Sequence, residues 1–102
     1  INDQRVIYQF METHPEKKFY VGEGPLHLIF YLEHDRSRYH SIHEIKNSED
    51  IKDSYIVARY RNPFGSQYPE ILDKREEWTV VLSSSNTTMD DNLRFRVYYV
   101  PP

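Results

Sequence analysis

Residues 93–100 read Leu-Arg-Phe-Arg-Val-Tyr-Tyr-Val, and this stretch decides the fold class that we expect. Apolar and polar side chains alternate along most of it. Successive side chains of a strand point to opposite faces, so such alternation is typical of a strand with one face on a core and the other toward solvent. We therefore predict a strand here, with Phe95 in the core. Its outward side chains would be Arg94, Arg96 and Tyr98.

The same alternation recurs along the chain and sets the expected architecture. It predicts further strands over residues 6–11, 19–21, 26–33, 55–61 and 78–83, with another possible at 42–45. Turn-forming residues separate these runs at 22–25, 62–66 and 83–92. Short helical turns are possible at 48–53 and 69–76, but no segment offers an obvious crossover helix for parallel strands. We therefore predict an all-β, antiparallel two-sheet sandwich of six to eight strands with at most one or two short helical turns. In general shape it resembles immunoglobulin-like and C2-like domains.

Length and composition limit the domain organisation and the cellular setting. The 102 residues correspond to one domain, which we place at 1–100. Pro101-Pro102 would then begin a stiff linker to the rest of a larger protein. The chain has no cysteine, which excludes disulfides and thiolate metal sites and mildly favours an intracellular location.

Charge and hydropathy argue against two classes of partner. The formal net charge is −3, whereas nucleic-acid-binding domains are usually basic. No apolar run approaches the roughly 20 residues that span a bilayer, so we expect no transmembrane segment. Contact with a membrane surface stays possible but less favoured.

The sequence gives little support for catalysis or metal binding. His34, His40 and His43 fall close together beside acidic residues, but their spacing does not match zinc-peptidase patterns. The aspartates of the expected loops form no repeated calcium-binding motif. There is no Gly-x-Ser-x-Gly element, and the chain has three glycines in all. We therefore expect no enzyme activity, no cofactor and no metal.

The outward faces of the predicted strands supply the candidate binding residues. Tyrosine and arginine are enriched at protein interfaces, and arginine binds carboxylate or phosphate groups through two hydrogen bonds. The set comprises Arg59, Arg61, Arg94, Arg96, Tyr98 and Tyr31. The same residue types are also ordinary on exposed strands. We predict a non-catalytic interaction module that contacts a protein partner or neighbouring domain through this sheet face or through a sheet edge.

Two other functions stay open at this point. Tyr31, Tyr98 or Tyr68 could stack on sugar rings in a carbohydrate-binding module. Asp90 and Asp91 could bind calcium at the loops of a C2-like, lipid-binding domain. Trp78 is predicted to lie in the core.

Overall fold

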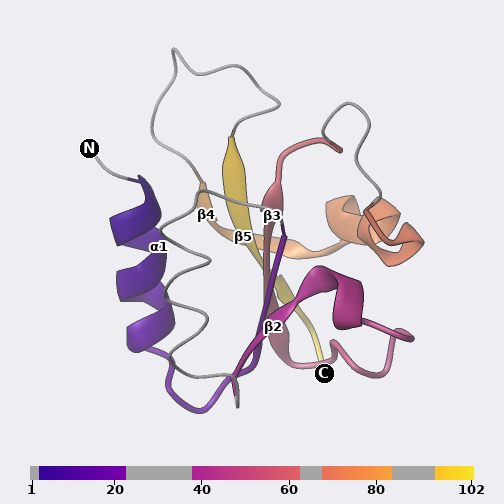
Figure 1. Ribbon diagram of the computed structural model, residues 1–102, viewed down its shortest axis with the longest axis horizontal. Coiled ribbons are helices and arrows are strands. Elements are labelled where there is room, and N and C mark those ends of the chain that lie inside the picture. The colour runs from indigo at the N-terminus through magenta and orange to yellow at the C-terminus, as the bar shows by residue number, and fades with distance from the viewer. Residues whose placement is uncertain (1–2, 23–37, 63–67, 84–93) are drawn as a thin grey trace.

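The computed structural model describes residues 3–22, 38–62, 68–83 and 94–102, and Figure 1 shows how their elements are arranged. The elements in chain order are α1 (Asp3–Glu12), β1 (Phe19–Val21), β2 (Tyr39–Ser41), the 3-10 helix η1 (Ile42–Glu44), β3 (Ser54–Arg59), the 3-10 helix η2 (Glu70–Glu77), β4 (Thr79–Ser83) and β5 (Phe95–Val100).

The strands form one mixed five-stranded sheet, so the predicted two-sheet antiparallel sandwich is wrong. The strand order is β2-β1-β3-β5-β4. β1 runs parallel to both β2 and β3, while β5 runs antiparallel to β3 and β4. The described residues of the crossover from β1 to β3 form β2, η1 and a series of turns. The expectation that the chain forms no parallel strand pairs is therefore wrong.

The first predicted strand is also wrong, because residues 6–11 belong to α1. Ile7 and Met11 are four residues apart and both are buried, which is the spacing of one helix face. Phe10 and His14 repeat that spacing, and their rings stack with centroids 4.2 Å apart. The six residues alternate as in a strand, although their burial follows the helical period of about 3.6 residues. The ten-residue helix also exceeds the one or two helical turns that we expected.

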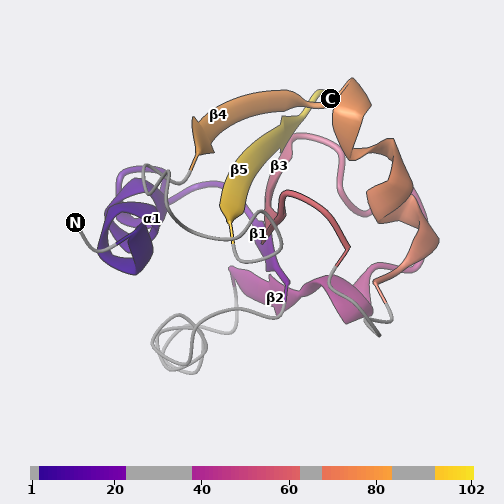
Figure 2. The same cartoon turned by 90° about the horizontal axis from the view of Figure 1, so that it is seen from above.

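The sheet is covered on both faces, which explains why the expected solvent face is missing. α1 lies on one face, and η1 and η2 lie on the other (Figures 1 and 2). The core under α1 consists of Ile7, Met11, Phe19, Val21, Tyr39, Val57, Phe95 and Val97. The core under η1 and η2 consists of Tyr20, Ile42, Ile51, Ile56, Ala58, Tyr68, Leu72, Tyr98 and Val100. Both sets of alternating side chains are therefore buried along the central strands.

The remaining local predictions divide by segment. Strands are confirmed within 19–21, 55–61, 78–83 and 93–100, and helical structure is confirmed at 69–76 as η2. Residues 42–45 contain η1 instead of a strand, because Ser41 and Glu44 form a capping box. Residues 48–53 form turns, where the Asn47 side chain accepts hydrogen bonds from the backbone of Glu49 and Asp50. The strand predicted at 26–33 lies outside the described residues.

Candidate functional site: an arginine-rich end of the sheet

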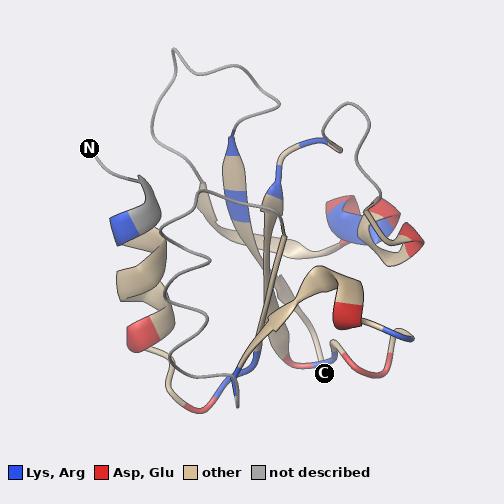
Figure 3. Ribbon diagram, in the orientation of Figure 1, with Lys and Arg blue, Asp and Glu red and all other residues tan. Residues whose placement is uncertain are grey.

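Four of the predicted binding residues gather at one end of the sheet. Arg59 is the last residue of β3 and is aligned with Phe95, the first residue of β5. One residue further on, the Tyr60 amide donates to the Arg94 carbonyl at 2.8 Å. Antiparallel pairing thus brings the end of β3 and the start of β5 together, and the cationic residues of both strands with them (Figure 3). We call Arg59, Arg61, Arg94 and Arg96 the arginine end.

These arginines share one end of the sheet and not one face. Arg59 is aligned with Phe95, and its guanidinium carbon lies 5.6 Å from the Phe95 ring centroid on the side covered by α1. Arg96 is aligned with Ala58, whose side chain belongs to the core on the other side. The arginine end can therefore surround an anion from two sides of the strand ends, but it does not form the flat contact face that alternation predicted.

Tyr60 organises the two arginines nearest to it. The guanidinium carbon of Arg96 lies 3.9 Å from the Tyr60 ring centroid, and that of Arg61 lies 5.5 Å from it. Cation–π contacts of this kind hold a guanidinium in place through its flat surface and leave its N–H groups at the edge for other acceptors. Arg61 is exposed and Arg96 is partly exposed. Tyr60 therefore orients two cations that an incoming anion can reach.

Tyr98 does not belong to an exposed surface. Its side chain is 1% exposed and its ring packs edge-on against Trp78, with centroids 6.1 Å apart. Burial raises the pKa of Tyr98, while a hydrogen bond with Arg96 acts in the opposite direction. The outward position predicted for Tyr98 is wrong, because η2 and its neighbours cover this face. Tyr98 instead forms a hydrogen bond with Arg96 from its buried position. Tyr31 lies outside the described residues.

Arg75 was missed by the sequence reasoning, although it adds a fifth cation next to the arginine end. It lies on η2 and is 7% exposed. Its guanidinium donates to the carbonyls of Leu72 and Arg59, at 2.7 and 2.8 Å, and to the side-chain oxygen of Asn62. It also lies over the Tyr68 ring. In sequence Arg75 follows Lys74 in a polar segment, and nothing there distinguishes the buried cation from the exposed one.

Among the described residues, no carboxylate is paired with Arg61, Arg75 or Arg96. The ion pairs of the described residues join Lys17 to Asp53, His40 to Glu44 and Lys52 to Glu49, all away from the arginine end. Within the described part of the chain, Arg61, Arg75 and Arg96 form no ion pair. Arg75 is bound instead by neutral oxygens, so its positive charge remains. The described residues of this end therefore concentrate positive charge on a chain whose formal net charge is −3.

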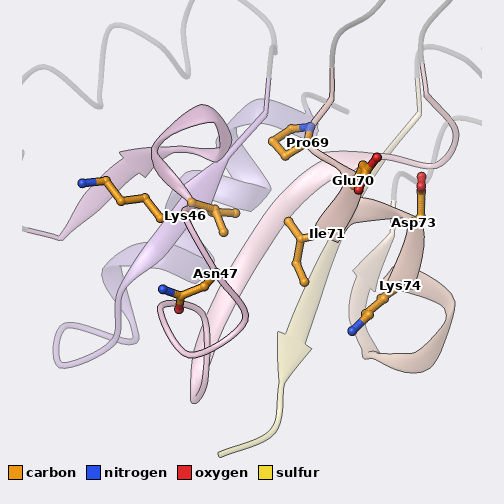
Figure 4. A pocket seen from close by; sticks show the side chains of 8 residues that line it. Lys46, Asn47, Pro69, Glu70, Ile71, Asp73 and Lys74 are labelled. Carbon is orange, nitrogen blue, oxygen red and sulfur yellow. The ribbon is translucent and has the colours of Figure 1, made fainter.

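An open groove lies elsewhere, between the segment after η1 and the start of η2 (Figure 4). Its volume is about 470 Å³, and it is lined by Ile45, Lys46, Asn47, Pro69, Glu70, Ile71, Asp73 and Lys74. Its apolar residues lie between two lysines and two carboxylates, so the lining has no net charge. The groove therefore offers an incoming ligand side chains of both charges.

The candidate metal ligands that the structure describes are not brought together. His40 stacks on Tyr20, with ring centroids 5.3 Å apart, and His43 is exposed on η1. Hydrogen bonds from the Lys46 and Asn47 amides lower the pKa of Asp50 and occupy its carboxylate. Across residues 3–22, 38–62, 68–83 and 94–102 there is no cluster of three such ligands. The other residues considered for metal binding, His34, Asp90 and Asp91, lie outside these ranges.

Comparisons with known proteins assign neither a family nor a function to the chain. No protein-family model matches the chain, and searches of curated proteins and of solved structures likewise give no match. In the part of the chain that the structure describes, no helix is long and apolar enough to cross a membrane.

Proposed function

We propose that this chain is a non-catalytic interaction module whose arginine end binds an acidic segment of a partner protein or a neighbouring domain. The observation that carries the proposal is the convergence of Arg59, Arg61, Arg94 and Arg96 on the paired ends of β3 and β5. Arginine is the cation best suited to this task, because its planar fork binds a carboxylate through two parallel hydrogen bonds.

The site is partly preorganised, which supports binding over simple surface charge. The Tyr60 ring holds Arg61 and Arg96, and Arg75 ties the Arg59 carbonyl to η2. Side chains that are already ordered lose less conformational entropy when a ligand binds. Because the chain as a whole is acidic, attraction of an acidic ligand has to come from a local cluster such as this one.

The proposal is tested with a short fluorescent polyglutamate peptide and a polyglutamine peptide of the same length. Fluorescence anisotropy should show saturable binding of polyglutamate that weakens as salt is added, and none of polyglutamine. Arg61→Ala and Arg96→Ala should each weaken binding by about two- to fivefold, as expected for the loss of one partly exposed charge contact. The matched control, Arg5→Ala, removes the same group from α1 and should leave the affinity unchanged.

Three results would contradict the proposal. The first is the absence of saturable polyglutamate binding, and the second is an equal loss in Arg5→Ala and in the arginine-end variants. The third is much tighter binding of a single-stranded oligonucleotide in a parallel titration, which would assign the arginine end to phosphodiester recognition instead. Circular dichroism of each variant separates loss of binding from loss of the fold.

A further inference from the structure

At Arg59 the strand β3 continues beyond its neighbour β1. The last aligned pair of these two strands is Val21 with Val57. Backbone groups two residues apart on a strand point to the same side, so those of Arg59 face the region beyond β1. Two side chains meet them there. The Arg59 amide donates to the Tyr68 hydroxyl at 3.3 Å, and the Arg59 carbonyl accepts from Arg75 at 2.8 Å. These side chains therefore take the place of β1 beside the end of β3.

Arg75 also holds the other end of the segment that begins at Arg59. One terminal nitrogen of its guanidinium donates to the Arg59 carbonyl, and the other donates to the side-chain oxygen of Asn62. Its Nε donates to a carbonyl of η2 at 2.7 Å, which anchors the side chain. Since the donors of a guanidinium form a rigid planar fork, the two outer contacts set the spacing of Arg59 and Asn62. The residues between them are Tyr60 and Arg61.

The enclosed residues include the ring that orders the arginine end. Tyr60 contacts both Arg61 and Arg96 through its ring. We propose that Arg75 and Asn62 act as a positioning clamp, which holds Tyr60 and its two arginines in the arrangement that binds an acidic segment. The inference rests on the proposed function, and it gives the uncharged Asn62 a part in anion binding. Arg75 acts through the clamp and not by touching the ligand, because it is buried and bound to three protein oxygens.

Two substitutions break the clamp without removing a charge. Asn62→Ala deletes one acceptor at an exposed position, so the fold should persist. Arg75→Lys keeps the cation, but a single ammonium on a flexible stem does not reproduce the fork. If Arg75 contributed only its charge to the arginine end, both variants would bind as the unmodified protein does. Asn47→Ala is the matched control, because the Asn47 side chain also accepts hydrogen bonds, in a turn away from the arginine end.

Fluorescence anisotropy with the polyglutamate peptide measures the effect on binding. Asn62→Ala and Arg75→Lys should each weaken binding by about two- to tenfold, because the ligand then has to immobilise side chains that the clamp otherwise holds. The double variant should bind no more weakly than Arg75→Lys alone, since both changes break the same clamp. The salt dependence of binding should stay that of the unmodified protein, because no charge is lost, whereas Arg61→Ala should reduce it. Asn47→Ala should bind normally.

Amide hydrogen exchange measured by NMR reports on the clamp without a ligand. The Tyr60 amide donates to the Arg94 carbonyl, and its exchange should accelerate in Asn62→Ala. Exchange of the Ile56 amide, further back in β3, should stay unchanged.

Several outcomes would overturn the clamp and leave the proposed function standing. They are an unmodified affinity in Asn62→Ala or in a folded Arg75→Lys, an equal loss in Asn47→Ala, strictly additive losses in the double variant, and an unchanged exchange rate at Tyr60. Absence of saturable polyglutamate binding by the unmodified protein would overturn both. Circular dichroism checks the fold of each variant, and if Arg75→Lys fails to fold, Asn62→Ala decides alone.

Discussion

The ammonium group of Lys17 donates to both carboxylate oxygens of Asp53, at 2.8 Å each. The Tyr99 hydroxyl donates to the same carboxylate. These bonds connect the segment before β1, the turn before β3 and a residue of β5, so one side chain joins three parts of the chain. Asp53 has φ 56°, a left-handed backbone conformation that Asp and Asn tolerate better than most residues.

This contact predicts a pH-dependent contribution to stability. The hydrogen bonds from Lys17 and Tyr99 lower the pKa of Asp53, and the bond to Asp53 raises the pKa of Lys17. The Asp53 contribution is therefore present above its usual pKa of about 4 and is lost as the pH falls through the lowered value. The Lys17 contribution is present below its usual pKa of about 10.4 and is lost as the pH rises through the raised value.

Asp53→Asn isolates the carboxylate charge, because Asn keeps the left-handed backbone accessible. Urea unfolding should show that this variant is less stable than the unmodified protein at neutral pH, and that the difference shrinks as the pH falls below about 4. Asp73→Asn, at an exposed position on η2, is the control and should show no such trend. A difference for Asp53→Asn that stays constant from neutral to acid pH would refute the electrostatic explanation.

Phe19→Ala should be more damaging than Trp78→Ala. Phe19 is fully buried between α1 and the sheet, and truncation of such a ring typically costs about 3–5 kcal/mol. Trp78 directly follows η2 and is only partly buried against the core beneath it, so its removal should cost less. Denaturant titrations followed by circular dichroism measure both variants without relying on tryptophan fluorescence. An equal or larger loss for Trp78→Ala would contradict this ranking.

Arg38 should stabilise the C-terminal end of α1. Its guanidinium donates to the carbonyls of Met11 and His14, at 2.7 and 2.8 Å, and lies over the rings of Tyr39 and Phe19. α1 has no basic residue in its own last turn, so Arg38 supplies this cation from outside the helix.

Arg38→Ala should lower stability by about 1–3 kcal/mol, because it leaves helix-end carbonyls without this donor. Amide hydrogen exchange should accelerate in α1 more than in β3 and β5. Lys18→Ala removes a nearby exposed cation and should leave exchange in α1 unchanged. Uniform acceleration across all elements of Arg38→Ala would indicate a global effect instead.

Gly22 lies where a side chain has no room. A Cβ at this position would come within 2.9 Å of the Tyr68 hydroxyl and 3.3 Å of the Val57 carbonyl oxygen, which already accepts from the Gly22 amide. Gly22→Ala should therefore destabilise the fold by about 1–3 kcal/mol, as expected for an overpacked site. The Tyr68 hydroxyl also accepts from the Arg59 amide, so the clash extends toward the arginine end.

A double-mutant cycle with Tyr68→Phe identifies the source of this strain. Removing the hydroxyl takes away the nearest atom, so Gly22→Ala should cost less in the Tyr68→Phe background than in the unmodified protein. Thermal unfolding of the four proteins measures the coupling. Strictly additive losses would show that the Tyr68 hydroxyl is not what excludes a side chain at residue 22.

The extended segments could be predicted from local pattern because alternation reflects how a strand exposes its two faces. This worked for β3, β4 and β5, and the acidic-to-basic order of 69–76 indicated η2. It failed for α1, where a few alternating residues imitate a strand while Ile7 and Met11 follow the helical period. The arginines of the candidate site were recognised from their residue type and their place in predicted strands.

The sequence by itself therefore determined the extended segments β1, β3, β4 and β5 and the cations that β3 and β5 carry, but not β2. Only the tertiary structure decided that β1 runs parallel to its neighbours and that both faces of the sheet are covered. It also decided that Tyr98 is buried and that Arg59 and Arg96 lie at the same end of the sheet on opposite faces. The physical reason is that alternation is a local property, produced by backbone geometry within a few residues. Strand partners and covering layers are set by contacts between distant segments, such as β3 with β5, and a repeat of two residues carries no information about them.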